Sequence, residues 1–330
     1  MADKTTKRLL LERLALATGP LSIGEIRESI PGVEAVPDRT LRRWLSEAVD
    51  RRLLRRHGEK RGTRYEPVRR PGSPTFKFLD GKTPVQREQV LKHLRDLWTH
   101  HSTAIEGNTL TLGDTHFILE EGLTISGKPI REHQEVIGHA SAIDLMYRVL
   151  SEPLTENTLF ELHRAVQAEV NHDVFKPNGA WKVEPNGTYT IGADDERVYL
   201  EYAHPRDVPA LMAEVIERLN TPEARQLTHE DAPAFYAAIH AAVAHIHPFW
   251  DGNGRIARLI ANLPLLQSGL PPVVIPKERR REYIQLLAGY ELACGVLTKA
   301  SGAWPNPERL AGLTRFVAEC YRTTRELLET

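Results

Sequence analysis

The chain has 330 residues, of which 41% are hydrophobic and 26% are charged, and its 43 basic residues almost balance its 44 acidic ones. This is the composition of an ordinary globular protein, with enough apolar residues for one medium core and a smaller domain. No apolar run approaches membrane-spanning length, the N-terminus lacks an apolar signal core, and Cys294 and Cys320 are expected to be buried free thiols. Nothing in these features suggests a membrane span or export, and we expect a cytoplasmic protein.

The basic charge is concentrated near the N-terminus, where three helices and a hairpin are predicted. Residues 1–70 contain 17 Lys and Arg against 10 Asp and Glu, whereas the remainder of the chain carries a net charge of −8. The predicted elements are a helix over 5–17, a helix opened by a capping box of Ser22 and Glu25, a helix capped by Asp38, and strands over 53–56 and 63–67. This order predicts a winged helix-turn-helix.

The third of these helices has an apolar face and a basic face. The residues expected to face inward are Leu41, Trp44, Leu45 and Ala48. Arg39, Arg42 and Arg43 are then expected to face solvent, where they would suit the phosphates and base edges of DNA. Such a module can equally serve as an interaction or dimerisation domain with solvated arginines, and the sequence leaves both interpretations open.

After a stretch rich in Pro, Gly and charge, the pattern is helix after helix. The predicted helices cover 85–101, 112–121, 133–150, 155–170, 208–219, 232–246 and 254–267. One hairpin interrupts them over residues 181–191, with a tight turn at Asn186-Gly187. The pattern predicts a mainly α bundle.

Chemically useful residues are most concentrated in His247-Pro248-Phe249-Trp250-Asp251-Gly252-Asn253-Gly254-Arg255-Ile256-Ala257-Arg258. An apolar-faced helix is expected to run up to His247 and to end at Pro248, and a second helix is expected to start at about Gly254. Gly252 and Gly254 can take backbone angles that other residues avoid and carry no Cβ, so an anion can approach the N–H groups around Asn253. The turn therefore has the form of an anion-binding nest.

Four side chains of this loop suit a polyphosphate. His247, with a reference pKa of about 6.5, can take a proton from an attacking hydroxyl near neutral pH. Asp251 offers the hard oxygen ligands that Mg²⁺ prefers, and Arg255 and Arg258 can hold two different phosphate groups. The alternatives are a purely structural turn and a zinc site formed by His245 and His247.

These residues resemble the signature of Fic-domain enzymes at every defining position. The resemblance implies transfer of a nucleotide, most often AMP from ATP, to a Ser, Thr or Tyr hydroxyl of a target protein. It makes His247 the general base, Asp251 the ligand of Mg²⁺ or Mn²⁺, and Arg255 and Arg258 the ligands of the ATP phosphates. The further implied contacts are an anion hole of Gly252, Asn253 and Gly254, and a loop anchor at Phe249.

A second motif lies upstream, in Ser102-Thr103-Ala104-Ile105-Glu106-Gly107-Asn108. It resembles the inhibitory helix motif Ser/Thr-x-x-x-Glu-Gly/Asn of the subclass that carries its inhibitor on the N-terminal side. A carboxylate offered to an arginine competes with a phosphate for the same guanidinium. Glu106 is therefore expected to pair with Arg258 and to keep ATP from placing its terminal phosphate productively. The alternative is a solvated helix carboxylate before a Gly107 C-cap.

Two other regions are compared with the same family. The predicted hairpin corresponds to a flap that binds the target segment by strand pairing. Arg280-Arg281-Glu282-Tyr283 is similar to an Arg-x-x-Tyr region whose tyrosine lines the nucleotide pocket. Glu291 departs from the pocket asparagine of many relatives, so the preference for adenine has less support than phosphate binding.

The sequence thus predicts a mainly α protein, a Fic-type helical bundle with a β-hairpin flap, preceded by a small winged helix-turn-helix. The expected divisions are a winged helix-turn-helix at 1–67, a linker at 68–84, an inhibitory helix region at 85–120 and a catalytic core with C-terminal helices at 121–330. The expected activity is autoinhibited transfer of AMP. The alternatives are removal of AMP from a modified protein and a DNA-binding regulator whose Fic core senses a nucleotide or modifies itself. The candidate partners are ATP, a target protein or the chain itself, DNA and a second copy of the chain.

Overall fold

The computed structural model describes residues 4–15, 17, 19–30, 32–50, 54–58, 62–67, 76–167, 173–191 and 196–329. The chain divides into two compact units, Met1–Ser73 with Leu79–Leu94 and Pro74–Phe78 with Arg95–Thr330. No helix in these described ranges is long and apolar enough to cross a membrane. Of the predicted linker, residues 68–75 lie outside the described residues.

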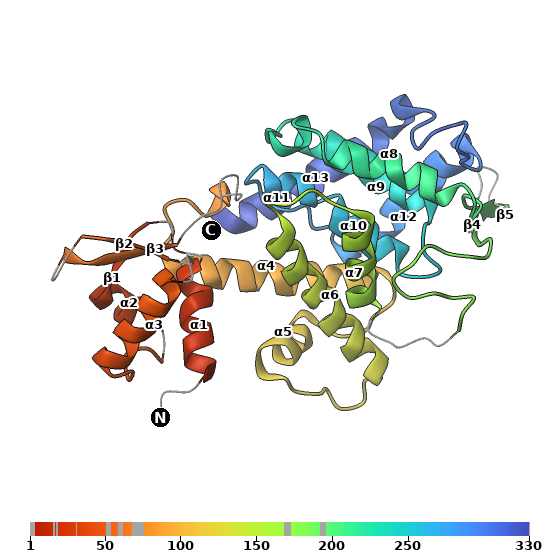
Figure 1. Cartoon of the computed structure of the whole chain (residues 1–330). Helices are drawn as coiled ribbons and strands as arrows, with labels where there is room; N and C mark the ends of the chain where they lie inside the picture. The colour runs from red at the N-terminus through yellow and green to blue at the C-terminus, as the bar shows by residue number, and fades with distance from the viewer. Residues whose placement is uncertain are drawn as a thin grey trace. The chain divides into compact units, whose positions relative to one another are not determined.

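The first unit contains three helices and a small sheet. Its elements are α1 (Lys4–Ala15), β1 (Leu21–Ser22), α2 (Ile23–Ser29), α3 (Asp38–Asp50), β2 (Leu54–His57) and β3 (Arg64–Pro67). The strands form an antiparallel sheet in the order β1-β3-β2, in which Leu21 pairs with Tyr65 and Arg55 with Glu66. The three helices lie beneath this sheet in Figure 1. The helices and the hairpin follow the predicted order.

A small apolar core and one capping box stabilise this unit. The residues of α3 that face the core are Leu41, Trp44, Leu45 and Ala48, as their spacing predicts. The capping box of α2 is confirmed, because the Glu25 N–H donates to Ser22 Oγ at 3.2 Å and the Ser22 N–H donates to Glu25 Oε2 at 2.7 Å. The local sequence signals of this unit therefore agree with its structure.

Asp38 differs from its predicted role as a cap that precedes the third helix. Helix α3 begins at Asp38 itself, so its carboxylate lies within the first turn. Its two oxygens accept hydrogen bonds from Arg27 at 3.0 Å and from Arg42 at 2.9 Å. The carboxylate thus pairs with two arginines, and its negative charge still suits the positive end of the helix dipole.

The second unit is almost entirely helical, which confirms the predicted fold class. Helix α4 (Pro84–Ile105) begins in the first unit and ends in the second. The following helices are α5 (Leu112–Glu121), α6 (Ile130–Val149), α7 (Glu156–Val166), α8 (Val208–Leu219), α9 (Ala232–Ile246), α10 (Asn253–Ile260), α11 (Leu263–Gln267), α12 (Arg280–Cys294) and α13 (Ala311–Glu329). The strands are β4 (Gly187–Ile191) and β5 (Arg197–Glu201).

Helix α9 is the central helix of this unit. Of its 15 residues, 13 are buried, which is the pattern of a helix covered on all sides. It packs against α8, α10, α12 and α13, which surround it in Figure 1. A fully covered helix therefore positions the loop that follows Ile246.

Most helix predictions are confirmed, and three of them, α5, α8 and α9, match residue for residue. The prediction of one helix over 254–267 is wrong, because α10 ends at Ile260 and α11 begins at Leu263. Pro264 has no N–H to continue the hydrogen-bond ladder of α10. At the break, the Asn262 side chain donates to the carbonyls of Arg258 and Val273 at 3.1 and 2.9 Å.

The hairpin is present, but its predicted turn is wrong. Strands β4 and β5 pair antiparallel with Gly187 opposite Glu201, so Asn186-Gly187 lies at the start of the first strand. Asn186 instead accepts a hydrogen bond from Lys182 Nζ at 2.6 Å and donates one to the Phe249 carbonyl at 3.3 Å. These two contacts, the second with a distant segment of the chain, outweigh the turn preference of Asn-Gly. Residues 192–195, which join the strands, lie outside the described residues.

Candidate active site

His247 ends α9 in a left-handed conformation, with φ 52° and ψ 59°. It is the only residue other than glycine with a positive φ in the described part of the chain. Such backbone strain costs on the order of 1–3 kcal/mol and is found mainly at functional sites. The His247 N–H donates to the Val243 carbonyl at 3.0 Å, and the ring stacks on Tyr202 with 3.7 Å between centroids. The neighbouring structure therefore holds the side chain in one orientation.

The hydrogen bonding of the His247 ring assigns its tautomer. Nδ1 lies 3.2 Å from the Ala244 carbonyl, which can only accept, so Nδ1 carries the proton. Burial and the nearby charge of Lys182 lower the pKa of His247 to about 3. The ring is therefore neutral at ordinary pH, and Nε2 keeps a lone pair that can take a proton.

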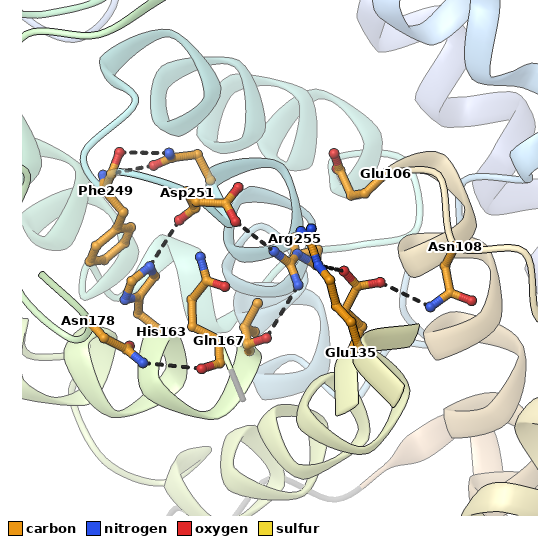
Figure 2. A network of polar contacts seen from close by, with 12 residues as sticks. Glu106, Asn108, Glu135, His163, Gln167, Asn178, Phe249, Asp251 and Arg255 are labelled. Atoms are coloured by element: carbon orange, nitrogen blue, oxygen red, sulfur yellow. Dashed lines mark hydrogen bonds and ion pairs between the residues drawn. The ribbon is translucent and has the colours of Figure 1, made fainter. Parts of the chain in front are cut away.

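The loop between α9 and α10 is clamped by buried contacts. The Phe249 N–H donates to Asn253 Oδ1 at 2.8 Å, and Asn253 Nδ2 donates to the Phe249 carbonyl at 2.9 Å (Figure 2). The Lys182 N–H donates to the Pro248 carbonyl at 2.9 Å. The Phe249 ring is completely buried and stacks on His163 with 3.9 Å between centroids. These contacts within the protein thus determine the conformation of the loop.

His163, on α7, also holds the main chain of Asp251. The Gly179 N–H donates to His163 Nδ1 at 2.8 Å, so the proton of the neutral ring lies on Nε2. This Nε2–H donates to the Asp251 carbonyl at 3.0 Å (Figure 2). Burial lowers the pKa of His163 to about 4, which keeps the ring in this neutral form.

The Asp251 carboxylate is ionised and reaches solvent, with 58% of its side chain exposed. Burial alone would raise the pKa of Asp251, but hydrogen bonds from Gln167 and the Gly252 N–H and the charge of Arg255 lower it below its usual value. Arg255 is itself buried and lies 3.5 Å from the Asp251 carboxylate, and it donates to the Val166 carbonyl at 3.3 Å. Gln167, Gly252 and Arg255 thus orient the ionised Asp251 carboxylate, which is exposed to solvent.

The two glycines of the loop act differently from each other. Gly252 has a φ of 78°, as predicted, but Gly254 has no positive φ, so the expected special backbone angle is wrong there. At Gly254 a Cβ would lie 2.5 Å from Glu106 Oε1, so the lack of a side chain permits the approach of Glu106. Because α10 starts at Asn253, its first N–H groups have no partner within the helix and are suited to an anion.

Arg258 is almost completely buried, and each of its three nitrogens donates. It donates to Glu106 Oε1 at 2.6 Å, to the Ser102 carbonyl at 2.9 Å and to Ser102 Oγ at 3.0 Å. A longer bond of 3.3 Å reaches the Tyr283 hydroxyl. The Arg258 side chain is 2% exposed and the Glu106 side chain 41% exposed. The predicted contact between Glu106 and Arg258 is therefore present, and the Glu106 side chain is partly exposed to solvent.

Tyr283 links Arg258 to the central helix. Its hydroxyl accepts from Arg258 and lies 3.0 Å from His240 Nε2 on α9, within hydrogen-bonding distance. Burial lowers the pKa of His240 to about 3, so this ring is neutral. These two contacts hold the Tyr283 side chain and one side of the Arg258 guanidinium in place.

A cavity of 350 Å³ brings together one group of the predicted site residues and leaves out another. The predicted residues that line it are Glu106, His247, Gly254, Arg258 and Tyr283. Asp251 instead lines a hollow of 230 Å³, together with Gln167, Lys176 and Trp250. The linings of both spaces lack Gly252, Asn253 and Arg255, whose side chains or backbone shape the loop between them.

Three residues that contact the site were not predicted from the sequence. His240 contacts the Arg258 network through Tyr283, while Tyr202 stacks on the ring of His247 and Lys182 lowers its pKa. Ser102, which belongs to the predicted upstream motif, binds Arg258 directly. His240 is one of two histidines in the mainly apolar α9, and a polar residue in such a helix is the local signal that could have indicated it. Lys182 and Tyr202 reach the site from a different segment of the chain, which no local pattern indicates.

The zinc interpretation does not agree with these contacts. His245 Nε2 donates to the Gly295 carbonyl at 2.8 Å. Within the described ranges, no group of three or more His, Cys, Asp or Glu residues could hold a metal ion. The strained histidine, the ionised Asp251 and the cavity beside Arg258 are together typical of a catalytic site.

The loop region also matches a known family. Residues 153–265 match the Fic/DOC family. The chain belongs to the Fic family. It is 34% identical over 248 residues to "Protein adenylyltransferase fic-1" of Caenorhabditis briggsae, and 33% identical over 245 residues to "Protein adenylyltransferase Fic" of Drosophila mojavensis. These alignments cover 72% and 73% of this chain but 42% of each relative, so the chain spans less than half the length of these curated relatives.

Solved structures of Fic proteins share the fold. A Fic domain containing signaling protein from Bacteroides thetaiotaomicron superposes with a TM-score of 0.66 at 27% identity, covering 77% of this chain and 92% of that one. Fic-1 from Caenorhabditis elegans superposes with a TM-score of 0.60 at 28% identity, covering 77% of this chain and 68% of that one. The fold and the signature of the loop therefore agree.

The predicted DNA-binding residues lie on the first unit. Arg39, Arg42 and Arg43 are all exposed on α3. Arg42 is paired with Asp38 at 2.9 Å and Arg43 lies 3.7 Å from Glu47. The basic face is therefore partly compensated by acidic neighbours on the same helix.

Proposed function

We propose that this chain is a protein adenylyltransferase, which transfers AMP from ATP to a hydroxyl side chain of a target protein and is restrained by Glu106. The observation that carries this proposal is the cavity that unites a neutral His247, with a free Nε2, and Arg258, engaged by Glu106. The names of the relatives support the same activity.

His247 is proposed to act as the general base. The target hydroxyl loses its proton to Nε2 while its oxygen forms a bond to the α-phosphorus of ATP. The bond from the α-phosphorus to the bridging oxygen breaks, and pyrophosphate leaves. The Nδ1–H of His247 keeps its hydrogen bond to the Ala244 carbonyl, and this bond keeps the base in the correct tautomer. The first N–H groups of α10 stabilise the charge that grows on the phosphate oxygens.

Asp251 fits a magnesium or manganese site that is completed by the substrate. Its carboxylate is ionised, exposed and oriented by Gln167 and Arg255. Mg²⁺ is commonly held by one or two carboxylates together with substrate phosphates, so a single protein carboxylate is sufficient. When bound, the ion would neutralise phosphate charge and orient the phosphates.

Glu106 is proposed to restrain ATP through Arg258. A carboxylate 2.6 Å from Nη2 occupies the position where a phosphate oxygen would bind the same guanidinium. Ser102 accepts two other N–H groups of Arg258 and Tyr283 accepts a third, whereas Glu106 lines the cavity beside Arg258. Because this carboxylate is partly exposed, ATP can displace it, and the restraint is graded.

The hairpin is proposed to dock the target segment. Thr188, Tyr189 and Thr190 of β4 line the cavity, and β4 pairs only with β5 among the described strands. A target segment can therefore add to the other edge of β4 by main-chain hydrogen bonds. Because His247 lines the same cavity as these residues of β4, a segment docked there would have His247 within the same space.

The deciding experiment compares labelling by α-labelled ATP for the parent and Glu106→Gly, on the chain itself and in a cell lysate. Strong labelling by Glu106→Gly and weak labelling by the parent are expected, because Arg258 becomes free for phosphate. The control is His247→Ala in the Glu106→Gly background, which should bind nucleotide without labelling. The proposal fails if this double variant labels protein as fast as Glu106→Gly.

Removal of AMP from a modified protein is a second candidate. It is favoured by the position of Glu106, whose exposed carboxylate lines the same cavity as His247 and could orient a water. A defined AMP-modified protein tests it. Release of AMP by the parent that is lost in Glu106→Gly supports removal, and no release by either variant argues against it.

DNA binding by the first unit is a separate candidate. Its support is the net charge of +7 over residues 1–70 and the exposed Arg39, which makes no ion pair with any described residue. Affinity for duplex DNA should fall steeply with salt and should weaken in Arg39→Ala. Absence of salt-dependent binding by the full chain removes this candidate.

A further inference from the structure

The cavity contains a buried acid that the proposed reaction does not use. Glu291 lies on α12 and lines the cavity, and the residue is only 6% exposed. Its carboxyl oxygens form no hydrogen bond or ion pair with any residue in the described ranges. The carboxyl group is therefore largely removed from solvent and has no protein partner, and it faces the space of the cavity, where a bound molecule can form hydrogen bonds with it.

The surroundings of Glu291 suit a flat heterocycle. The apolar residues that line the same cavity are Leu200, Ala244, Ile284, Leu287 and Ala288. Tyr283 and Glu291 share one face of α12 and are two helical turns apart, roughly 12 Å along the axis. Tyr283 contacts Arg258, the proposed phosphate ligand. This separation is comparable to the length of a nucleotide from its phosphate to the edge of its base.

We propose that the Glu291 carboxyl determines the base specificity of this cavity, by donating one hydrogen bond to a ring nitrogen of adenine and accepting another from its exocyclic amino group. The inference rests on the proposed function, because it takes the cavity to be the nucleotide site. A protonated carboxyl presents one donor beside one acceptor, and adenine presents the complementary pair. An ionised carboxylate presents two acceptors, which cannot satisfy the ring nitrogen.

The environment favours the protonated form. Burial raises the pKa of Glu291 to about 8. The titratable groups that interact with it are the phenols of Tyr202, Tyr283 and Tyr290. The other charged or titratable groups of the cavity are Glu106, Tyr189, His247, Arg258 and Arg280. Arg258 and Arg280 are already engaged, by Glu106 and by the Ile105 carbonyl at 2.6 Å, and neither pairs with Glu291.

The sign of the pH dependence follows from this protonation. Adenine binds the protonated carboxyl, so affinity is highest below the pKa and falls as the pH rises through it. Two pH units, from 7 to 9, reduce the protonated fraction roughly tenfold for a group with a pKa of about 8. Glutamine has the same donor and acceptor at every pH, so Glu291→Gln should keep adenine binding and lose this decline.

The test measures ADP and GDP binding by calorimetry at pH 7 and pH 9, using the full chain with Glu106→Gly. Variants with Glu291, Glu291→Gln and Glu291→Leu are compared. ADP affinity is expected to fall about tenfold from pH 7 to pH 9 with Glu291 and to stay within twofold with Glu291→Gln. At pH 7 both should prefer ADP to GDP, and Glu291→Leu should lose that preference. Comparison with Glu291→Gln cancels the titration of the phosphates and of Lys182, whose pKa burial lowers to about 7.

The outcomes separate this inference from the proposed function. An equal pH decline in the Glu291 and Glu291→Gln proteins overturns the inference, and so does an unchanged ADP preference in Glu291→Leu. In both cases ADP binding persists, so the transferase proposal stands. If neither nucleotide binds any variant that unfolds as cooperatively as the parent, the cavity is not a nucleotide site and both proposals fail. If Glu291→Leu does not fold, the comparison of the pH dependence of ADP affinity between the Glu291 and Glu291→Gln proteins still tests the inference.

Discussion

The loop His247–Arg258 and the Glu106 carboxylate meet at one guanidinium, but they are held in opposite ways. The loop is fixed by a completely buried Phe249 ring and by paired hydrogen bonds between Phe249 and Asn253. Glu106 is held to it by one ion pair, and its side chain is 41% exposed. The difference indicates that the catalytic geometry is built in advance, whereas access to Arg258 is adjustable.

The largest effect is expected when the anchor of the loop is removed. Phe249→Ala should lower the free energy of unfolding by about 3–5 kcal/mol, because it leaves a cavity where the ring stacks on His163. The matched control is Phe117→Ala, since the Phe117 side chain is 51% exposed. Denaturant unfolding of both variants measures the difference. A loss for Phe249→Ala no larger than that for Phe117→Ala would show that the loop is not fixed by this anchor.

A smaller effect, mainly on ATP binding, is expected when the charge of Glu106 is removed. Glu106→Gln keeps the shape of the side chain and removes its charge, so ATP should bind about 5–150-fold more tightly, the usual range for a coupling of about 1–3 kcal/mol. Unfolding should change by less than in Phe249→Ala, because Arg258 retains its bonds to Ser102 and Tyr283.

The control for this variant is Glu121→Gln, at the exposed end of α5 and outside the cavity. Calorimetric titration with ATP should show no change for it. If Glu106→Gln binds ATP no better than Glu121→Gln does, the ion pair with Arg258 is structural and the proposed restraint is wrong.

The same contrast explains what could be predicted from sequence. The loop residues are contiguous, so their identities and spacing indicated the chemistry, and helix α9 was predicted residue for residue from its apolar run. The Asn186-Gly187 turn was wrong because Lys182 and Phe249, neither adjacent to it in sequence, bind the Asn186 side chain. The turn preference of Asn-Gly is weak compared with these two partly buried hydrogen bonds, one of which joins a distant segment.

The supporting residues of the site were harder to predict for a related reason. His240 acts through Tyr283, and Tyr202 acts by stacking on the ring of His247. Each contact joins separate segments of the chain, and only the fold brings them together. The separation of Asp251 from the cavity of Arg258 is likewise a property of the folded loop, since the two residues are seven apart in sequence.

The smallest of these effects is a pH dependence that belongs to the loop. The pKa of His163 falls to about 4 in the folded chain because of burial, whereas an unfolded histidine titrates near 6.5. The unfolded chain therefore binds the extra proton first, so the stability that this residue contributes is complete above pH 6.5 and declines as the pH falls toward 4. At pH 5.5 the loss from His163 alone should be about 1.4 kcal/mol, one pKa unit.

Unfolding at pH 7.5 and pH 5.5 tests this, with His163→Gln compared with His93→Gln, an exposed histidine on α4. His93→Gln should lose as much stability on acidification as the parent does, because the buried histidines, which include His240 and His245, are still present. His163→Gln should be less stable at pH 7.5 and should lose about 1.4 kcal/mol less between the two pH values. An equal loss in both variants would mean that His163 does not couple the loop to protonation, and the clamp on Asp251 would then depend on its other contacts.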